Sequence, residues 1–393
     1  MVYKKINYSE VTWPIRKLGE VCDLPSPGIK EFEGKKRYVA TADIDYDRIT
    51  NFSKITYKNR PHRANVEVEE NDVLVAKMAQ TLKLLLATKE HQKDYIFSTG
   101  FAVLRAKEEY LVPSYLFYFL TTKDFNLQKD KLAVGATQKA INHQAFKRIK
   151  MPILPLKIQQ EIVERLDVIR KAQELNDKQI ALADELFQSL LWRELELKGK
   201  DWEVRRFGEI SGFQYGYTAP AKELGEYRFI RITDIDDNGD LRNEDIKYIN
   251  GPEKDLTPYF LKYGDLLVAR TGATFGKILF FNLKEKSIFA SYLIRLNINK
   301  KFISPSYLWL FSRTKEYWKQ AMNLMTGSGQ PQFNANKIKR IRVPVPPLKS
   351  QLQIIEKLQA VQDYKKKLLK QKQKLQELFE SWLDKAMKGE LVN

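Results

Sequence analysis

Pro113-Ser114-Tyr115-Leu116 recurs as Pro305-Ser306-Tyr307-Leu308, a shift of 192 residues (305 minus 113) in a chain of 393 residues. The whole of residues 97–198 returns at 289–390 with this shift. Ten further residues keep it: Gly135, Gln138, Asn142, Lys147, Ile149, Pro152, Pro155, Leu156, Gln159 and Ile162 return as Gly327, Gln330, Asn334, Lys339, Ile341, Pro344, Pro347, Leu348, Gln351 and Ile354. Solenoid repeats have periods of roughly 20 to 50 residues, whereas a repeat of this length is large enough to hold its own core. The sequence therefore predicts two related domains.

The upstream part of each copy follows the same order. Trp13 matches Trp202, Asp43 matches Asp234, and Asp72-Val73-Leu74-Val75-Ala76 matches Asp265-Leu266-Leu267-Val268-Ala269. The shift drifts here between 189 (202 minus 13) and 193 (265 minus 72), as small insertions would produce. Because both copies keep this order, the duplication covers the whole chain.

Each copy combines strand and helix signals. Runs of β-branched and aromatic residues, interrupted by Gly, Pro and Asn, predict short strands. These runs are 37–42, 72–76, 228–233, 265–269 and 277–281. Pro113–Thr121 and Pro305–Thr314 predict helices that begin at proline. A mixed α+β domain fits both copies, although the pattern does not give the order of the strands.

A long helix is predicted to follow each domain, because residues 156–198 and 348–388 contain no Gly or Pro. Val361, Leu368, Leu375 and Trp382 are spaced by seven residues. Ile162, Leu166, Ile169, Ile180, Ala183, Phe187 and Leu190 keep steps of three and four or their sums. Both patterns are typical of coiled coils. Lys365, Lys372 and Asn176 fall on the seams, where we expect imperfect, partly hydrated packing.

The predicted architecture is α+β, with boundaries at 1–154 (domain 1), 155–199 (spacer helix 1), 200–346 (domain 2) and 347–393 (spacer helix 2). At about 1.5 Å per residue, each helix is a rod of roughly 60 Å. If the rods pack together, the simplest arrangement is two antiparallel helices that separate the domains, with an internal pseudo-two-fold axis. The alternative is a helical arm used only for oligomerisation.

Positive charge is distributed equally between the two domains. The net charge is +18, and Lys and Arg outnumber Asp and Glu by 26 to 18 in residues 1–155 and by 24 to 16 in residues 200–347. Such surplus cations keep a protein soluble, but matched basic domains are also typical of a protein that holds a nucleic acid at two points. The equal excess favours nucleic acid.

Composition argues against several other classes. No stretch approaches the roughly 20 uncharged apolar residues of a membrane helix, and Met1–Asn7 lacks the apolar core of a signal peptide, so we expect a cytoplasmic protein. Cys22 is the single cysteine, and one cysteine with three histidines does not make a convincing zinc site. We therefore expect no metal and no cofactor on this chain.

The search for catalytic motifs is negative. Thr271–Ile278 resembles a phosphate-binding loop, but only three residues separate its glycines, and Ile278 stands where a Mg²⁺ ligand is required. The acidic pairs Asp43 with Asp45 and Asp234 with Asp236 would suit a Mg²⁺-dependent nuclease, but turn formation at a strand end explains them better. No catalytic residue is predicted.

Other loops suit DNA binding. Residues 270–277 follow a predicted strand and combine glycines with two cations that could approach a phosphate or a guanine edge, and residues 77–83 are their counterpart in the first copy. Residues 135–142 and 327–336 are rich in Gln and Asn, which can pair with adenine. Surface turns are the alternative explanation. The candidate DNA-binding residues are Lys77, Gln80, Lys83, Gln138, Lys139, Asn142, Arg270, Thr271, Lys277, Gln330, Gln332 and Asn334.

The chain resembles the specificity subunits of type I DNA restriction-modification systems. The residues that carry the likeness are 264–272 with Gly276-Lys277, and the segments 135–159 and 327–351, each with a proline stop before a glutamine-bearing helix start. The order of domain and helix covers the whole chain. Copy one departs from the pattern at Lys77-Met78-Ala79-Gln80, and Ile158 and Ser350 stand where an acidic residue is common in the family.

The resemblance implies a non-catalytic subunit with two target-recognition domains, each reading half of a bipartite site on double-stranded DNA. The helices would act as a ruler and dock two modification subunits that bind S-adenosylmethionine. Restriction subunits, with ATP and Mg²⁺, would complete the complex. The residues themselves leave two alternatives open: a DNA-binding scaffold or regulator without such partners, and a nuclease that uses Asp43 or Asp234.

Overall fold

Contacts divide the chain into two compact units. The computed structural model describes residues 13–135, 139–195, 201–326, 332–388 and 390. Unit 1 comprises Met1–Asp177 with Lys370–Asn393, and unit 2 comprises Lys178–Leu369. Each unit therefore contains one copy of the repeat, together with part of both long helices.

Unit 1 contains two four-stranded sheets. The first has the order β2-β11-β8-β9 and is antiparallel. The second has the order β6-β3-β10-β7, in which β3 and β10 run parallel. The strands are β1 (Ile15–Lys17), β2 (Cys22–Asp23), β3 (Lys36–Val39), β4 (Ile44–Asp45), β5 (Arg48–Ile49), β6 (Ser53–Ile55), β7 (Ala64–Val66), β8 (Val73–Ala76), β9 (Leu84–Leu86), β10 (Tyr95–Ser98), β11 (Phe101–Ala106) and β12 (Lys150–Pro152). β1 pairs with β12, and β4 pairs with β5.

Unit 2 repeats this topology with one strand fewer in its second sheet. Its antiparallel sheet has the order β14-β20-β17-β18, and its second sheet has the order β16-β15-β19, with β15 and β19 parallel. The strands are β13 (Glu203–Arg206), β14 (Ser211–Tyr215), β15 (Tyr227–Ile230), β16 (Tyr248–Ile249), β17 (Leu266–Ala269), β18 (Ile278–Phe280), β19 (Ser287–Phe289), β20 (Leu293–Ile298) and β21 (Arg342–Val345). β13 pairs with β21, as β1 does with β12. The mixed α/β class and the duplication are confirmed.

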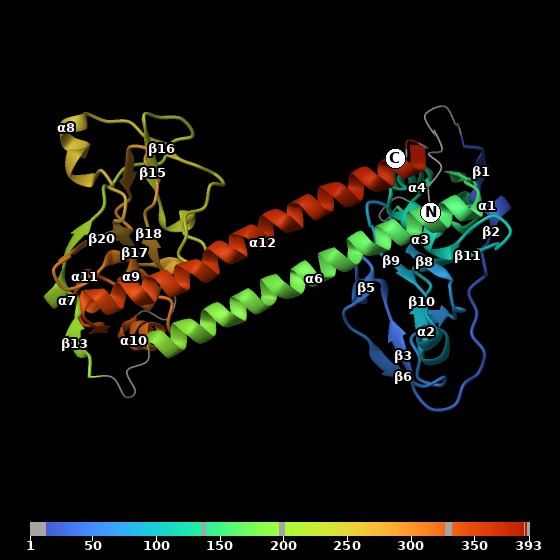
Figure 1. The fold of residues 1–393 in the computed structure, drawn as a ribbon, viewed down its shortest axis with the longest axis horizontal. Helices are drawn as coiled ribbons and strands as arrows, with labels where there is room; N and C mark the ends of the chain where they lie inside the picture. Colours follow the sequence, from blue (N-terminus) through green and yellow to red (C-terminus); the bar gives the residue numbers. More distant parts are fainter. Residues whose placement is uncertain (1–12, 136–138, 196–200, 327–331, 389, 391–393) are drawn as a thin grey trace, which may run out of the picture. The chain divides into compact units, whose positions relative to one another are not determined.

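Five helices of each copy correspond between the units, whereas α2 lies between β9 and β10 and α8 lies between β16 and β17. Those of the first copy are α1 (Leu18–Val21), α2 (Lys89–Asp94), α3 (Pro113–Thr121), α4 (Lys123–Leu132), α5 (His143–Phe146) and α6 (Leu156–Leu195). Those of the second copy are α7 (Phe207–Ile210), α8 (Glu253–Leu256), α9 (Pro305–Phe311), α10 (Lys315–Leu324), α11 (Ala335–Ile338) and α12 (Leu348–Lys388). Figure 1 labels most of these elements, and α6 and α12 are drawn as uninterrupted helices. In the described part of the chain, none of the helices is long and apolar enough to cross a membrane.

Three predicted boundaries lie three residues beyond those of the structure, and side-chain capping explains each of these differences. β3 and β15 end early because Asp43 and Asp234 accept backbone N–H groups of Ala40 and Arg231 (both 2.8 Å) and so form 3₁₀ turns. α9 ends at Phe311, before the predicted Thr314, because the Thr314 hydroxyl caps α10 instead.

The repeated Pro-Ser-Tyr-Leu stretch builds the core of each unit. Tyr115 in α3 and Tyr307 in α9 are fully buried. Their hydroxyls donate to equivalent carbonyls, that of Pro152 at 3.3 Å and that of Pro344 at 3.0 Å. A buried tyrosine needs such a partner for its hydroxyl. The packing explains why the stretch marks the fold in both copies.

Each long helix carries a buried glutamine in its first turn. Gln159 accepts from the backbone N–H of Val112 (2.8 Å) and donates to the carbonyls of Tyr110 (2.8 Å) and Leu154 (2.7 Å). In the second copy, Gln351 makes the three equivalent bonds, to the backbone of residues 302, 304 and 346. Both glutamines are fully buried. They fix the start of each long helix to its own domain.

Within each unit the two long helices pack side by side and antiparallel. In unit 1, Gln173 donates to the carbonyl of Leu375 (3.3 Å), and Asp177 pairs with Lys372 (2.8 Å). In unit 2, Asp184 pairs with Lys365 (2.6 Å). In both units the residue number rises on α6 as it falls on α12. The predicted long helices are therefore confirmed.

The three polar seam residues differ in burial. The side chains of Lys365 and Lys372 are 33% and 56% exposed, so these lysines lie at the edge of the seam and reach a carboxylate. Asn176 is buried.

Candidate nucleic-acid interface

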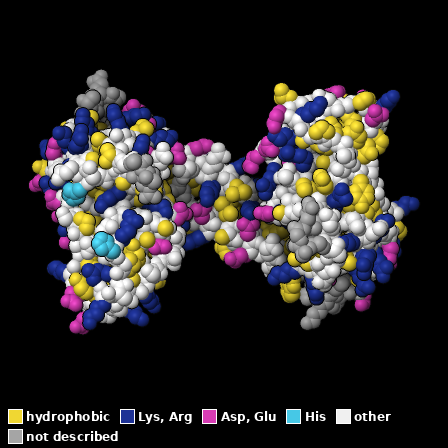
Figure 2. All heavy atoms as spheres, turned by 180° about the vertical axis from the view of Figure 1, so that it is seen from behind, with side chains coloured by type: hydrophobic (Ala, Val, Ile, Leu, Met, Phe, Trp, Pro, Cys, Tyr) yellow, Lys and Arg dark blue, Asp and Glu magenta, His cyan; other side chains and the backbone are white. Residues whose placement is uncertain are grey.

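The two loops that sequence singled out hold equivalent places in their units. Residues 77–83 connect β8 to β9, and residues 270–277 connect β17 to β18. Both preceding strands are buried at every residue. Each loop therefore begins where the chain leaves the core. On the face drawn in Figure 2, Lys and Arg side chains lie over both units, among fewer Asp and Glu.

We call residues 77–83 and 270–277 the cation loops, and the described residues 139–142 and 332–336 the amide-rich segments. In each unit the cation loop pairs with the amide-rich segment, so two separately predicted segments lie together. Ile141 donates its N–H to the carbonyl of Lys77 (2.9 Å), and Phe333 donates to that of Arg270 (2.8 Å). Single antiparallel bridges join Met78 to Ala140 and Thr271 to Gln332. Gln138 and Gln330 lie outside the described residues.

The first cation of each loop is tethered by a backbone carbonyl. Lys77 Nζ donates to Thr99 O (2.9 Å), and Arg270 Nε donates to Ser291 O (3.0 Å). Burial lowers the pKa of Lys77, and the charge of Arg63 lowers it further. The Arg270 guanidinium also lies 5.3 Å from the ring centroid of Tyr215 and 5.4 Å from that of Tyr292.

The second cations are engaged differently. Lys83 Nζ donates to the carbonyl of Thr41 (2.8 Å). Lys277 Nζ instead pairs with the Asp237 carboxylate (2.7 Å), and this pairing lowers the pKa of Asp237. Lys277 is therefore neutralised locally, whereas Lys83 has no carboxylate partner among the residues that the structure describes.

The amide candidates have structural roles in the backbone. Asn142 caps α5 by accepting from Ala145 N (2.8 Å), and Asn334 caps α11 by accepting from Lys337 N (3.2 Å). Because an N-cap uses the side-chain oxygen, that oxygen already holds one hydrogen bond in each residue, and the amide NH₂ remains for other partners. Gln332 lies in the bridges to Thr271 and Thr326.

The remaining candidates differ in accessibility. Gln80 is exposed in a left-handed backbone conformation (φ 56°), and its N–H donates to Asp130. Lys139 is exposed, and its carbonyl accepts from Ala79. Thr271 is buried, so its side chain does not reach the surface. DNA contact by any of these residues stays a prediction.

In each unit a buried side chain of α4 or α10 donates a hydrogen bond to a carbonyl of the cation loop, but the donor residue differs between the two copies. In unit 1 the fully buried Lys129 donates to the carbonyl of Thr81. In unit 2 the Tyr317 hydroxyl donates to the carbonyl of Gly276 (2.5 Å). With the 192-residue shift, Tyr317 replaces Phe125, and Ala321 replaces Lys129. Each copy therefore supplies one buried donor to its loop, from different positions of the same helix.

Sequence reasoning missed a further pair of equivalent cations, one in each unit. Lys147 and Lys339 are exposed and equivalent under the repeat (339 minus 147 is 192). Burial lowers the pKa of His143, and the nearby charges of Lys147 and Lys77 lower it further. Because the same residue type stands at both equivalent positions, comparison of the two copies could have identified Lys147 and Lys339 as candidates.

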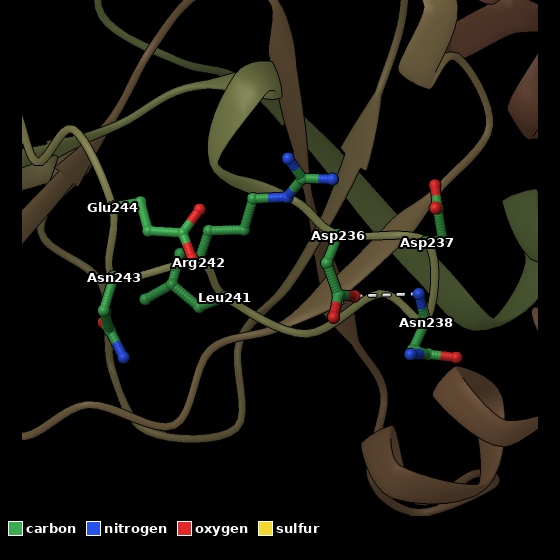
Figure 3. A pocket seen from close by; sticks show the side chains of 7 residues that line it. All are labelled: Asp236, Asp237, Asn238, Leu241, Arg242, Asn243 and Glu244. Atoms are coloured by element: carbon green, nitrogen blue, oxygen red, sulfur yellow. Dashed lines mark hydrogen bonds between the residues drawn. The ribbon is translucent and has the colours of Figure 1, made fainter. Parts of the chain in front are cut away.

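The acidic pair of unit 2 forms turns, as expected. Asp234 accepts from the backbone N–H of Arg231 and pairs with its guanidinium (2.8 Å). Asp236 accepts from the N–H groups of Asn238 and Asp240 (both 2.8 Å), and the first of these bonds is drawn in Figure 3. Residues 236–238 and 241–244 line a pocket of about 500 Å³. Its aspartates thus shape the loop, and among the described residues no three His, Cys, Asp or Glu gather as metal ligands would.

Comparisons with known proteins agree with the duplicated geometry. Residues 10–183 and 199–378 each match the type I restriction modification DNA specificity domain. The chain is 22% identical to the type I restriction enzyme MjaVIII specificity subunit of Methanocaldococcus jannaschii, over 99% of this chain and 97% of that protein. It is 24% identical to the EcoKI specificity subunit of Escherichia coli K12, over 83% and 76%.

The fold also has a solved counterpart. A chain from a structure described as the basis of complex assembly and conformational transition of the type I R-M system superposes with a TM-score of 0.66, at 22% identity, over 96% of this chain and 98% of that one. At this identity the likeness concerns the fold.

Proposed function

The chain belongs to the type I restriction modification DNA specificity domain family, and from this premise we propose that it reads a bipartite DNA target, one half-site per domain. The duplication is the observation that carries the proposal. Both copies match the family, and both set a cation loop against an amide-rich segment through equivalent backbone bonds. Because the two homologous domains differ in their loop residues, each can read a different half of the target sequence.

We infer that the paired helices act as the ruler between the half-sites. The antiparallel contacts in each unit, together with the buried glutamine at each helix start, support a stiff connection. Helix length then sets the gap between half-sites, at about 1.5 Å per residue.

The helices also carry the proposed docking surface for two modification subunits. Val168, Leu175 and Leu182 follow one another at seven-residue spacing along α6 and are 69%, 53% and 61% exposed. An apolar stripe at heptad spacing favours a further helix as its partner. In this proposal S-adenosylmethionine, ATP and Mg²⁺ belong to the modification and restriction subunits, and this chain supplies no catalytic group.

The proposal is tested by purifying the tagged chain from its native host. We expect a methyltransferase to co-purify and, when the complex is mixed with genomic DNA, methylation at a split motif. A chain that co-purifies no methyltransferase but binds DNA would be a scaffold or regulator. Cleavage of plasmid by the chain alone with Mg²⁺ would establish the nuclease alternative.

A further inference from the structure

We propose that Lys77 and Arg270 are equivalent phosphate anchors, each binding the DNA backbone in its own half of the target without regard to base sequence. The inference rests on the proposed function and assigns a ligand, the phosphodiester group, to the start of each cation loop. It separates holding the DNA from reading it.

The two residues occupy the same backbone position. The N–H of Lys77 donates to Gly100 O (2.9 Å), and that of Arg270 donates to Tyr292 O (3.0 Å). Gly100 and Tyr292 are equivalent under the 192-residue shift, as are Ile141 and Phe333, which bind the two carbonyls. The duplication has therefore preserved a rigid mount for a cation at this point.

The side chains share a tether as well. Lys77 Nζ and Arg270 Nε each donate one bond, to Thr99 O and Ser291 O, and these two acceptors are again 192 residues apart (291 minus 99). A lysine ammonium has three donors, and a guanidinium has five. Most donors of both groups are thus available, and in the described part of the chain neither cation pairs with a carboxylate. Lys277, which Asp237 neutralises, lacks this property.

A second cation lies near the anchor of unit 2, and Lys147 is its counterpart in unit 1 under the 192-residue shift. In unit 2, Arg270 lies over Tyr215, and Lys339 lies 5.7 Å from the ring centroid of Phe213. Phe213 and Tyr215 are two residues apart on β14 and so face the same side. Unit 2 therefore presents two cations on the same side of β14, as successive phosphates along a DNA strand require.

The ligand is a phosphate and not a base because the anchors persist where the loops differ. Residues 78–81 read Met-Ala-Gln-Thr, whereas residues 271–274 read Thr-Gly-Ala-Thr. If the two domains read different base sequences, the contacts that they share are those that do not depend on sequence. Such contacts are made to phosphate and sugar. Both Lys and Arg bind phosphate oxygens, so a lysine in one copy and an arginine in the other suit this role.

The test measures the salt dependence of binding with the full chain in its native complex. The probes are one arbitrary 40-base-pair duplex, titrated from 50 to 200 mM KCl, and a pool of random duplexes for motif selection. The variants are Lys77→Ala, Arg270→Ala and the double variant, with Lys77→Arg and Arg270→Lys as conservative forms. Lys254→Ala, which removes an exposed charge on α8, controls for bulk charge.

The slope of log Kobs against log [KCl] is negative, and each alanine variant is expected to make it less steep by about 0.9. The double variant should make it less steep by about 1.8, and the selected motif should stay unchanged. The conservative forms and Lys254→Ala keep the wild-type slope. An unchanged slope in properly folded alanine variants, an equal drop in Lys254→Ala, or loss of one base preference in Arg270→Ala would overturn the anchors. If the wild-type complex selects a split motif while the slopes stay unchanged, only this inference fails. If the slopes fall but no split motif appears, the bipartite proposal fails instead.

Discussion

Replacing Gln159 by leucine is expected to destabilise unit 1 at the point where the long helix joins its domain. The substitution keeps most of the side-chain volume but removes three hydrogen bonds, from Val112 N and to Tyr110 O and Leu154 O. Gln159 is fully buried, so water does not take its place easily.

The magnitude follows from the groups left without partners. A buried backbone group that loses its hydrogen bond costs about 1–3 kcal/mol. Three such groups set an upper range, which burial of a leucine side chain offsets by about 1.5–3 kcal/mol. Three groups together cost about 3–9 kcal/mol, so the net loss is about 1.5–6 kcal/mol. For a unit of this size, 1 kcal/mol corresponds to roughly 2–4 °C in Tm, so Tm should fall by roughly 3–24 °C.

The adjacent glutamine is a matched control. Gln160 is exposed, and Gln160→Leu makes the same chemical change one residue away. Thermal unfolding followed by circular dichroism, with urea titration to check cooperativity, compares the two variants. If Gln159→Leu and Gln160→Leu unfold together, the buried glutamine does not fix the helix start.

Three further predictions concern the long helices as a ruler and the buried Lys129 that donates to the first cation loop. Inserting one heptad after Asp177 and one after Leu369 lengthens both helices by about 10 Å, so the gap between half-sites in the selected motif should grow by up to about 3 base pairs, with both half-sequences intact; an unchanged gap would refute the ruler. Lys129→Ala removes the donor to Thr81 and should cost about 1–3 kcal/mol, and adding Phe125→Tyr, which copies the second unit, should recover part of it in urea unfolding; no recovery would mean that the donors are not interchangeable. Burial lowers the pKa of Lys129 below its ordinary 10.5, so the unfolded chain binds that proton more tightly and stability should rise with pH just below 10.5; Lys129→Met should lack this rise, and an equal rise in both proteins would assign it to other groups.

The duplication made much of the fold accessible from sequence. Identical residues at a constant shift predicted two related domains. The absence of Gly and Pro from residues 156–198 and 348–388 predicted two long helices. Both features depend on local pattern and comparison of the chain with itself. The order of the strands depends on non-local pairing, such as the parallel contact of β3 with β10, which no single-sequence pattern encodes.

The candidate site was predictable in its loops but not in its contacts. Sequence placed cations at Lys77 and Arg270, yet their tethers Thr99 and Ser291 lie in turns after β10 and β19, 22 and 21 residues further along the chain. The amide pattern favoured Asn142 and Asn334 as base readers, whereas their position immediately before a short helix makes them caps. The pairing of Lys277 with Asp237 joins residues 40 positions apart, which composition could not reveal.

The most direct test is motif selection from random duplex DNA by the full chain in its native complex. Two constant half-sequences separated by a gap of fixed length are the predicted result. A single continuous motif, or two halves at variable spacing, would contradict a protein in which paired helices hold two DNA-reading domains a set distance apart.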